Sequence, residues 1–186
     1  MTSKLSLTEL KKRLSLKSNA ELIEEIAELY KKFPAIKEYY QASFSGDDAA
    51  ILDKYKDIVR GEFLMRGNRF PKMRLSVARK AVADFKKISS SVQSIADIMI
   101  TYVEAGVSCT LEFGDIDESF YNSMESMYES AIKYIVKEHL FVEFGNRLYD
   151  IVQDTHDIGW GFHDQLSYLY ENYEAMVKEP QVPFKI

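Results

Sequence analysis

The spacing of apolar residues limits what this chain can fold into more than any other feature of its sequence. Between residues 18 and 40 the apolar residues follow one another in steps of four and three: Leu22, Ile26, Leu29, Phe33, Ile36 and Tyr40. Such steps place side chains on one face of an α-helix. The spacing recurs in later segments up to residue 176, and no alternating, β-branched-rich run predicts a strand. The pattern therefore predicts an all-α protein.

About eight helices are expected, and their short connections predict a compact bundle of mostly antiparallel neighbours. A stack of helical hairpins is the alternative arrangement, although the sequence has no fixed repeat period. Ser6 with Glu9, and Ser18 with Glu21, have the spacing of capping boxes and predict two helix starts. Pro34 is expected to kink or divide the second helix.

The length of 186 residues, with 46% hydrophobic and 28% charged residues, predicts a single globular domain with its own core. We expect this domain to cover residues 1–178, with residues 1–45 as a semi-independent helical hairpin. Residues 179–186 contain two prolines and are expected to form an extended tail.

The single cysteine, Cys109, excludes an internal disulfide framework and suits a reducing compartment. Its position in an apolar helix favours a buried thiol over a nucleophile. The first residues contain no apolar run of signal-peptide length, and the apolar stretch from Ile95 to Val107 is interrupted by Asp97 and Glu104. A cytoplasmic protein without membrane association is therefore expected.

Charge is distributed unevenly along the chain. Residues 54–87 carry eleven Lys and Arg against three acids, whereas residues 104–186 carry five against sixteen. Five cations on or beside one predicted helix form a candidate phosphate-contact face: Arg74, Arg79, Lys80, Lys86 and Lys87. This face suggests nucleic-acid binding. The alternative is a solvated face, or one docked on the acidic C-terminal half.

A second candidate site lies in the segment DTHDIGWGFHD, residues 154–164. Its polar side chains are suited to a divalent metal or to acid–base chemistry: Asp154, His156, Asp157, His163 and Asp164. Their spacing matches no established metal motif. The competing interpretation is a helix end followed by a helix start, with Asp157 and Asp164 near the helix termini and Trp160 filling the core.

Twelve tyrosines and seven methionines are a rich supply for this length. Tyr121, Tyr128, Tyr168, Tyr170 and Tyr173 cannot all point into one core, so some are expected at the surface. Exposed Tyr and Met favour contacts with other proteins. An arrangement with rings at the core edge and hydroxyls in water is equally compatible with the sequence.

Three parts of the chain together resemble a known family. They are LTELKKRLSLKSNAELIEEIAELYKKFPAIKEYY, then ARKAVADFKK with ADIMITYVEAG, and finally FYNSMESMYESAIKYI with DIGWGFHDQLSYLY. This set is similar to the bacterial domain-of-unknown-function family 6155, over nearly the whole chain. The resemblance implies a bacterial, cytoplasmic, helical protein and carries no catalytic motif.

The sequence thus favours a non-catalytic helical protein-interaction or scaffold module that uses no cofactor. A protein partner is expected, and a second copy of the chain is one candidate. Nucleic-acid binding through residues 54–87 is the first alternative. A metal-dependent enzyme at residues 154–164 is the second.

Overall fold

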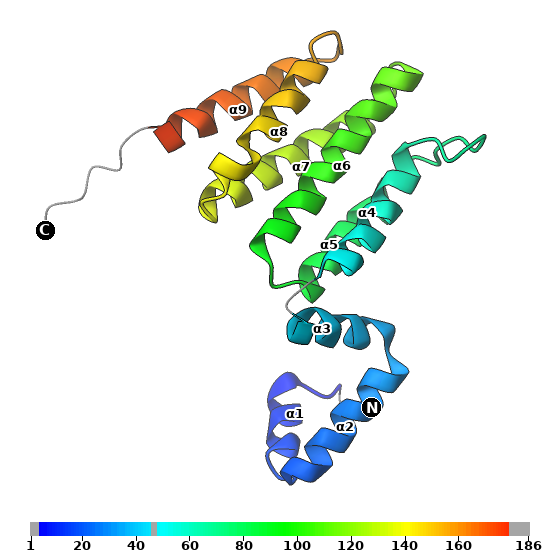
Figure 1. Cartoon of the computed structure of the whole chain (residues 1–186), viewed down its shortest axis with the longest axis vertical. Coiled ribbons are helices and arrows are strands. Elements are labelled where there is room, and N and C mark those ends of the chain that lie inside the picture. The colour runs from blue at the N-terminus through cyan, green and yellow to red at the C-terminus, as the bar shows by residue number, and fades with distance from the viewer. Residues whose placement is uncertain (1–3, 46–47, 179–186) are drawn as a thin grey trace, which may run out of the picture.

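A computed structural model describes residues 4–45 and 48–178 (Figure 1). The described residues form nine α-helices and no strand, which confirms the all-α prediction. The helices are α1 (Leu7–Leu14), α2 (Asn19–Lys32), α3 (Pro34–Ser45), α4 (Ala49–Phe63), α5 (Leu75–Ile88), α6 (Val92–Phe113), α7 (Glu118–Lys137), α8 (Phe141–Asp154) and α9 (Phe162–Lys178). The expected tail, residues 179–186, lies outside the described residues.

The last six helices form three antiparallel hairpins, α4–α5, α6–α7 and α8–α9, which lie side by side (Figure 1). Helix α6 packs against α4 on one side and α8 on the other, and α7 packs against α9. The hairpins therefore stack, as short connections between amphipathic helices allow.

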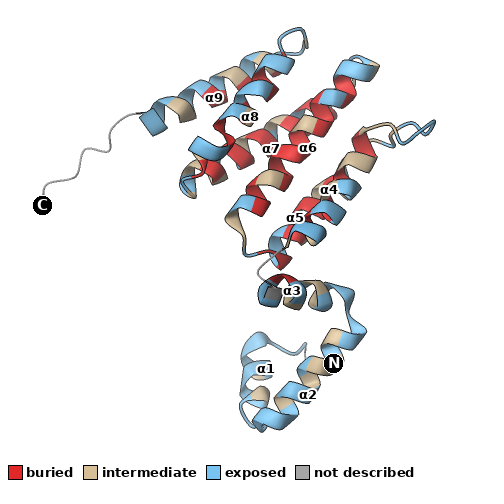
Figure 2. Ribbon diagram, viewed as in Figure 1, coloured by how far each residue is buried: buried red, intermediate tan, exposed pale blue. Residues whose placement is uncertain are grey.

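The core of this stack is centred on α6, in which 14 of the 22 residues are buried (Figure 2). The ring of Phe63 packs edge-on against Tyr102 and Phe120, with centroids 5.2 and 5.9 Å apart. Helices α6 and α7 approach closely at Gly106, where a Cβ atom would lie 2.2 Å from Sδ of Met124. By length and composition α6 could span a membrane, but 72% of its most apolar window is buried in the protein, as in a core helix.

The N-terminal helices lie outside this core. Pro34 divides the predicted second helix into α2 and α3, because the residue before a proline disfavours helical angles; Phe33 has φ −120° and ψ 110°. This division gives nine helices instead of eight. The capping box of Ser18 and Glu21 is present, and Ser6 accepts a hydrogen bond from the backbone N–H of Glu9.

Asp48 precedes α4, but its side chain makes no cap there. Its carboxylate instead accepts hydrogen bonds from the hydroxyls of Ser89 and Ser94, the latter at 2.7 Å. The start of α4 is thereby tied to the connection between α5 and α6.

Candidate functional site

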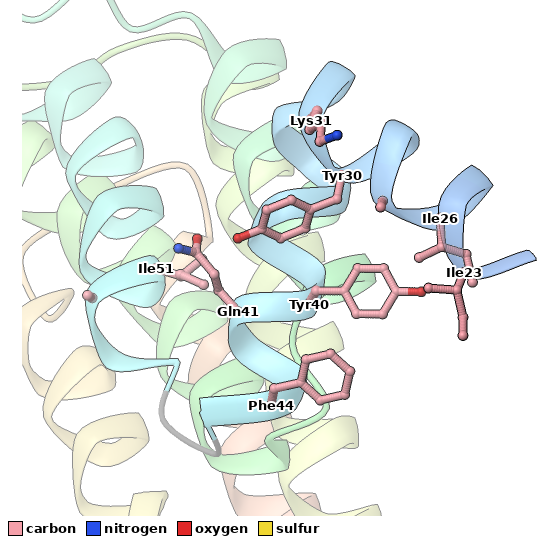
Figure 3. A pocket seen from close by; sticks show the side chains of 10 residues that line it. Ile23, Ile26, Tyr30, Lys31, Tyr40, Gln41, Phe44 and Ile51 are labelled. Carbon is pink, nitrogen blue, oxygen red and sulfur yellow. The ribbon is translucent and has the colours of Figure 1, made fainter. Parts of the chain in front are cut away.

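An open apolar groove lies between the N-terminal helices and the start of α4, and we call it the α2–α3 groove (Figure 3). Its volume is about 1110 Å³. The lining comprises Ile23, Ile26, Ala27, Tyr30, Lys31, Tyr40, Gln41, Phe44, Ala50 and Ile51.

The break at Pro34 forms the groove, because it turns α3 back so that one face of α3 meets one face of α2. Figure 3 shows the ring of Tyr40 pointing from α3 toward Ile23 and Ile26 of α2. Tyr40 also stacks on Phe44, one turn later, with ring centroids 5.4 Å apart. Its centroid is 6.4 Å from that of Tyr30. Five residues from two helices thus form one continuous apolar wall.

Helix α3 connects this region to the hairpin stack. Ala42 is buried where α3 meets α5. The carboxylate of Glu38 accepts a hydrogen bond from the hydroxyl of Tyr55 at 2.9 Å and pairs with Lys54. Burial of the phenol, reinforced by the Glu38 carboxylate, raises the pKa of Tyr55 well above its ordinary value. These few contacts of α3 therefore attach the α2–α3 groove to the hairpin stack.

The groove is exposed to solvent to an unusual degree for an apolar surface. None of the described residues of α1 and α2 is buried, as Figure 2 shows. Ile23 is 67% exposed and Phe44 83% exposed. Among the residues that the structure describes, the lining contains Lys31 as its one charged side chain and no carboxylate, imidazole or thiol. This arrangement suits the binding of an apolar surface.

The candidate phosphate-contact face is mostly engaged by neighbouring side chains. Arg74 makes a two-pronged ion pair with the buried carboxylate of Glu62, and this pairing holds the pKa of that carboxyl below its ordinary value. Lys80 and Lys87 both pair with Asp84 on the same helix.

The other two cations of this face contact α7, in the acidic half of the chain. Arg79 donates hydrogen bonds to the hydroxyl and carbonyl oxygens of Ser123, at 2.8 and 2.7 Å. Lys86 places its ammonium 5.6 Å from the ring centre of Tyr134. Although they are paired, Arg74, Lys80, Lys86 and Lys87 remain exposed to solvent. Two further exposed cations, Arg69 and Lys72, flank a 73% exposed Phe70 in the α4–α5 loop.

The two histidines of residues 154–164 do approach each other, with ring centroids 5.5 Å apart. The hydroxyl of Thr155 donates to the carbonyl of Val152, so Nδ1 of His163, 3.1 Å from Thr155 Oγ1, is the protonated nitrogen. Nε2 then accepts from Ser167 at 3.3 Å. Both imidazole nitrogens of His163 are thereby engaged.

The carboxylates of this segment do not join the histidines in a ligand set. Asp157 is exposed and contacts His156 alone, at 3.1 Å, while Asp154 and Asp164 are also exposed. Within residues 4–45 and 48–178, no three His, Cys, Asp or Glu side chains gather closely enough to hold a metal ion. The expectation that Trp160 fills the core is wrong, because its side chain is 66% exposed; the residue has a positive φ of 64°.

The tyrosines divide between core and surface. Tyr121, Tyr128 and Tyr170 are buried, Tyr173 is half-buried and Tyr168 is exposed. The apolar opening of the α2–α3 groove lies away from these five tyrosines, and sequence reasoning missed it. Its signal in the sequence was the apolar face that continues over residues 18–40.

Comparison with known proteins places the chain by family alone. The model of a family of unknown function, DUF6155, matches residues 5–174, which is most of the chain. Neither the curated proteins nor the solved structures include a match to it.

Proposed function

The chain belongs to the DUF6155 family of unknown function, and from the geometry of its N-terminal helices we propose that it is a non-catalytic protein-interaction module. The observation that carries this proposal is the exposed α2–α3 groove. Contiguous apolar surface of this kind marks sites where proteins bind one another. Isolated Tyr or Leu side chains at a surface would carry no such meaning.

The stability of α2 supports the same function. A helix of 14 residues is marginal in water by itself and depends on burial of its apolar face. In this chain that face lines an open groove, so a bound protein would complete its burial. Helix-in-groove recognition uses apolar side chains three and four residues apart, and Ile23, Ile26 and Tyr30 of α2 have that spacing.

The test is site-specific photo-crosslinking in cells that express the full chain. A benzoylphenylalanine placed at Phe44, at the exposed edge of the groove, should give covalent protein adducts on irradiation. The matched control is the same residue at Val142, which is 97% exposed but lies on α8, away from the groove. Adducts that are absent, or equally abundant at both positions, would refute an interaction site at the groove.

Nucleic-acid binding is the second candidate, supported by exposed Arg69, Phe70 and Lys72 in the α4–α5 loop. Cations flanking an aromatic ring suit a single strand, whose bases stack while its phosphates pair. A binding titration should then show affinity that falls steeply with salt and is lost in Arg69→Ala/Lys72→Ala. No binding at low salt would exclude this candidate.

A further inference from the structure

We propose that the partner at the α2–α3 groove is a second copy of the chain, related by a two-fold axis that sets the two α2 helices antiparallel. This inference rests on the proposed function, since it names the occupant of the same groove. A two-fold interface requires a surface that is complementary to itself. The charge pattern of α2 meets this requirement.

The acids of α2 precede its bases. Four glutamates occupy the helix up to residue 28, and Lys31 and Lys32 occupy its end; the glutamates are Glu21, Glu24, Glu25 and Glu28. In an antiparallel pair, the acidic part of each helix lies along the basic end of the other. A parallel pair would set acids against acids and bases against bases, which is repulsive.

One residue pair defines the position of the axis. Glu24 and Lys31 are seven residues apart, about two helical turns, so they lie on the same flank of α2. They are equidistant from the point between residues 27 and 28. An axis through that point brings Glu24 of each copy to Lys31 of the other. Lys31 lines the groove, and its pairing with Glu28 is a surface contact in which the lysine side chain is 65% exposed.

The apolar side chains fit the same axis. Ala27 lies beside it, and its small side chain allows the two helices to approach closely. Ile23 and Tyr30 lie on opposite sides of the axis, and their distances from it along the helix differ by two residues, or about 3 Å. An antiparallel pair therefore sets Ile23 of one copy near Tyr30 of the other, which buries the exposed isoleucine.

A second copy of the chain is also always available as a partner. Within a single folded chain the apolar face of α2 is uncovered. A partner that covers this face must therefore be present wherever the chain is. A second copy is present at the concentration of the chain itself. An association between copies then strengthens with that concentration.

The experiment is sedimentation equilibrium of the full chain over a wide concentration range, with charge-swap variants. Wild type should show a monomer–dimer equilibrium. Glu24→Lys, and separately Lys31→Glu, should each weaken dimerisation about tenfold, because two symmetry-related attractions become repulsions. The double variant Glu24→Lys/Lys31→Glu restores the opposite charges across the axis and should restore most of the affinity. The matched control is Glu129→Lys/Lys133→Glu, an exposed pair on α7, which should change nothing.

Each result decides the matter. A strict monomer, or a dimer indifferent to both single changes, overturns the inference. A dimer weakened by the single changes but not restored by the double variant overturns the antiparallel arrangement. A monomer whose Phe44 position crosslinks to a different protein overturns the second copy as partner but leaves the proposed function standing. A monomer without crosslinked adducts overturns both.

Discussion

Replacing Arg147 should weaken the hairpin stack, because this side chain joins two of its hairpins. The guanidinium on α8 donates to both oxygens of Glu104 at 2.8 Å and to Oδ1 of Asp97 at 2.7 Å, both on α6. Lys56 on α4 reaches the other oxygen of Asp97 at 2.8 Å. Arg147→Met keeps most of the side-chain volume and removes the charge, which leaves two carboxylates facing an apolar thioether.

The size of the effect follows from how far the cluster is buried. Breaking a fully buried ion pair costs about 3–5 kcal/mol, whereas an exposed pair contributes about 0–1 kcal/mol. The side chains of Arg147, Asp97 and Glu104 are 34%, 21% and 36% exposed, between these limits. We therefore expect a loss of about 2 kcal/mol in the free energy of unfolding, and a fall in Tm of roughly 4–8 °C for a chain of this size.

The measurement is urea and thermal denaturation followed by circular dichroism. Lys133→Met is the matched control, because Lys133 pairs with Glu129 at the surface of a single helix, with side chains 54% and 45% exposed. That variant should lose less than about 0.5 kcal/mol. If Arg147→Met proves no more destabilising than Lys133→Met, the cluster does not hold the hairpins together and the reasoning fails.

Three further predictions concern the same stack. Burial alone would raise the pKa of Asp97, but hydrogen bonds from Lys56 and Arg147 outweigh it and hold the pKa below its ordinary value. The stability that Asp97 contributes is therefore present above its unfolded pKa of about 3.9 and is lost as pH falls through its folded pKa. The difference in Tm between wild type and Asp97→Asn should narrow over that pH range. A difference that stays constant with pH would contradict this prediction. Burial, with a smaller contribution from Glu112, raises the pKa of the Cys109 thiol to about 11. Iodoacetamide at pH 8 should therefore label this thiol only as fast as the protein unfolds. Rapid labelling of the native protein would contradict this, because it would show that the thiol is accessible. Gly106→Leu should cost about 1–3 kcal/mol by overpacking against Met124, whereas Gly159→Ala, with nothing within 4 Å of the added Cβ, should be nearly neutral; equal Tm values would disprove the close contact.

Periodicity was sufficient to predict the helices, because an apolar face repeats in the sequence whatever covers it. For α4 to α9 that face meets another helix, and the prediction of packed neighbours is confirmed. For α2 the same pattern is present, but its apolar face lines an open groove. Spacing cannot distinguish these cases, since the covering side chains come from elsewhere in the chain or from another molecule.

The candidate phosphate-contact face shows which pairings a sequence reveals. Lys80 and Lys87 lie four residues before and three residues after Asp84, so their ion pairs could be read from helical spacing. The contacts of Arg79 with Ser123 join residues 44 positions apart and depend on how α5 meets α7. The exposure of Trp160 depends on a left-handed backbone angle at that residue, which the flanking glycines did not predict.

The central position of α6 has a consequence for how this protein can unfold. Stacked hairpins in an open array contact only their neighbours, so an end hairpin can fray while the others persist. In this chain α6 packs against helices of all three hairpins: α4, α5, α7 and α8. The loss of any hairpin strips cover from the same buried helix, so residues 49–178 should melt in one cooperative transition.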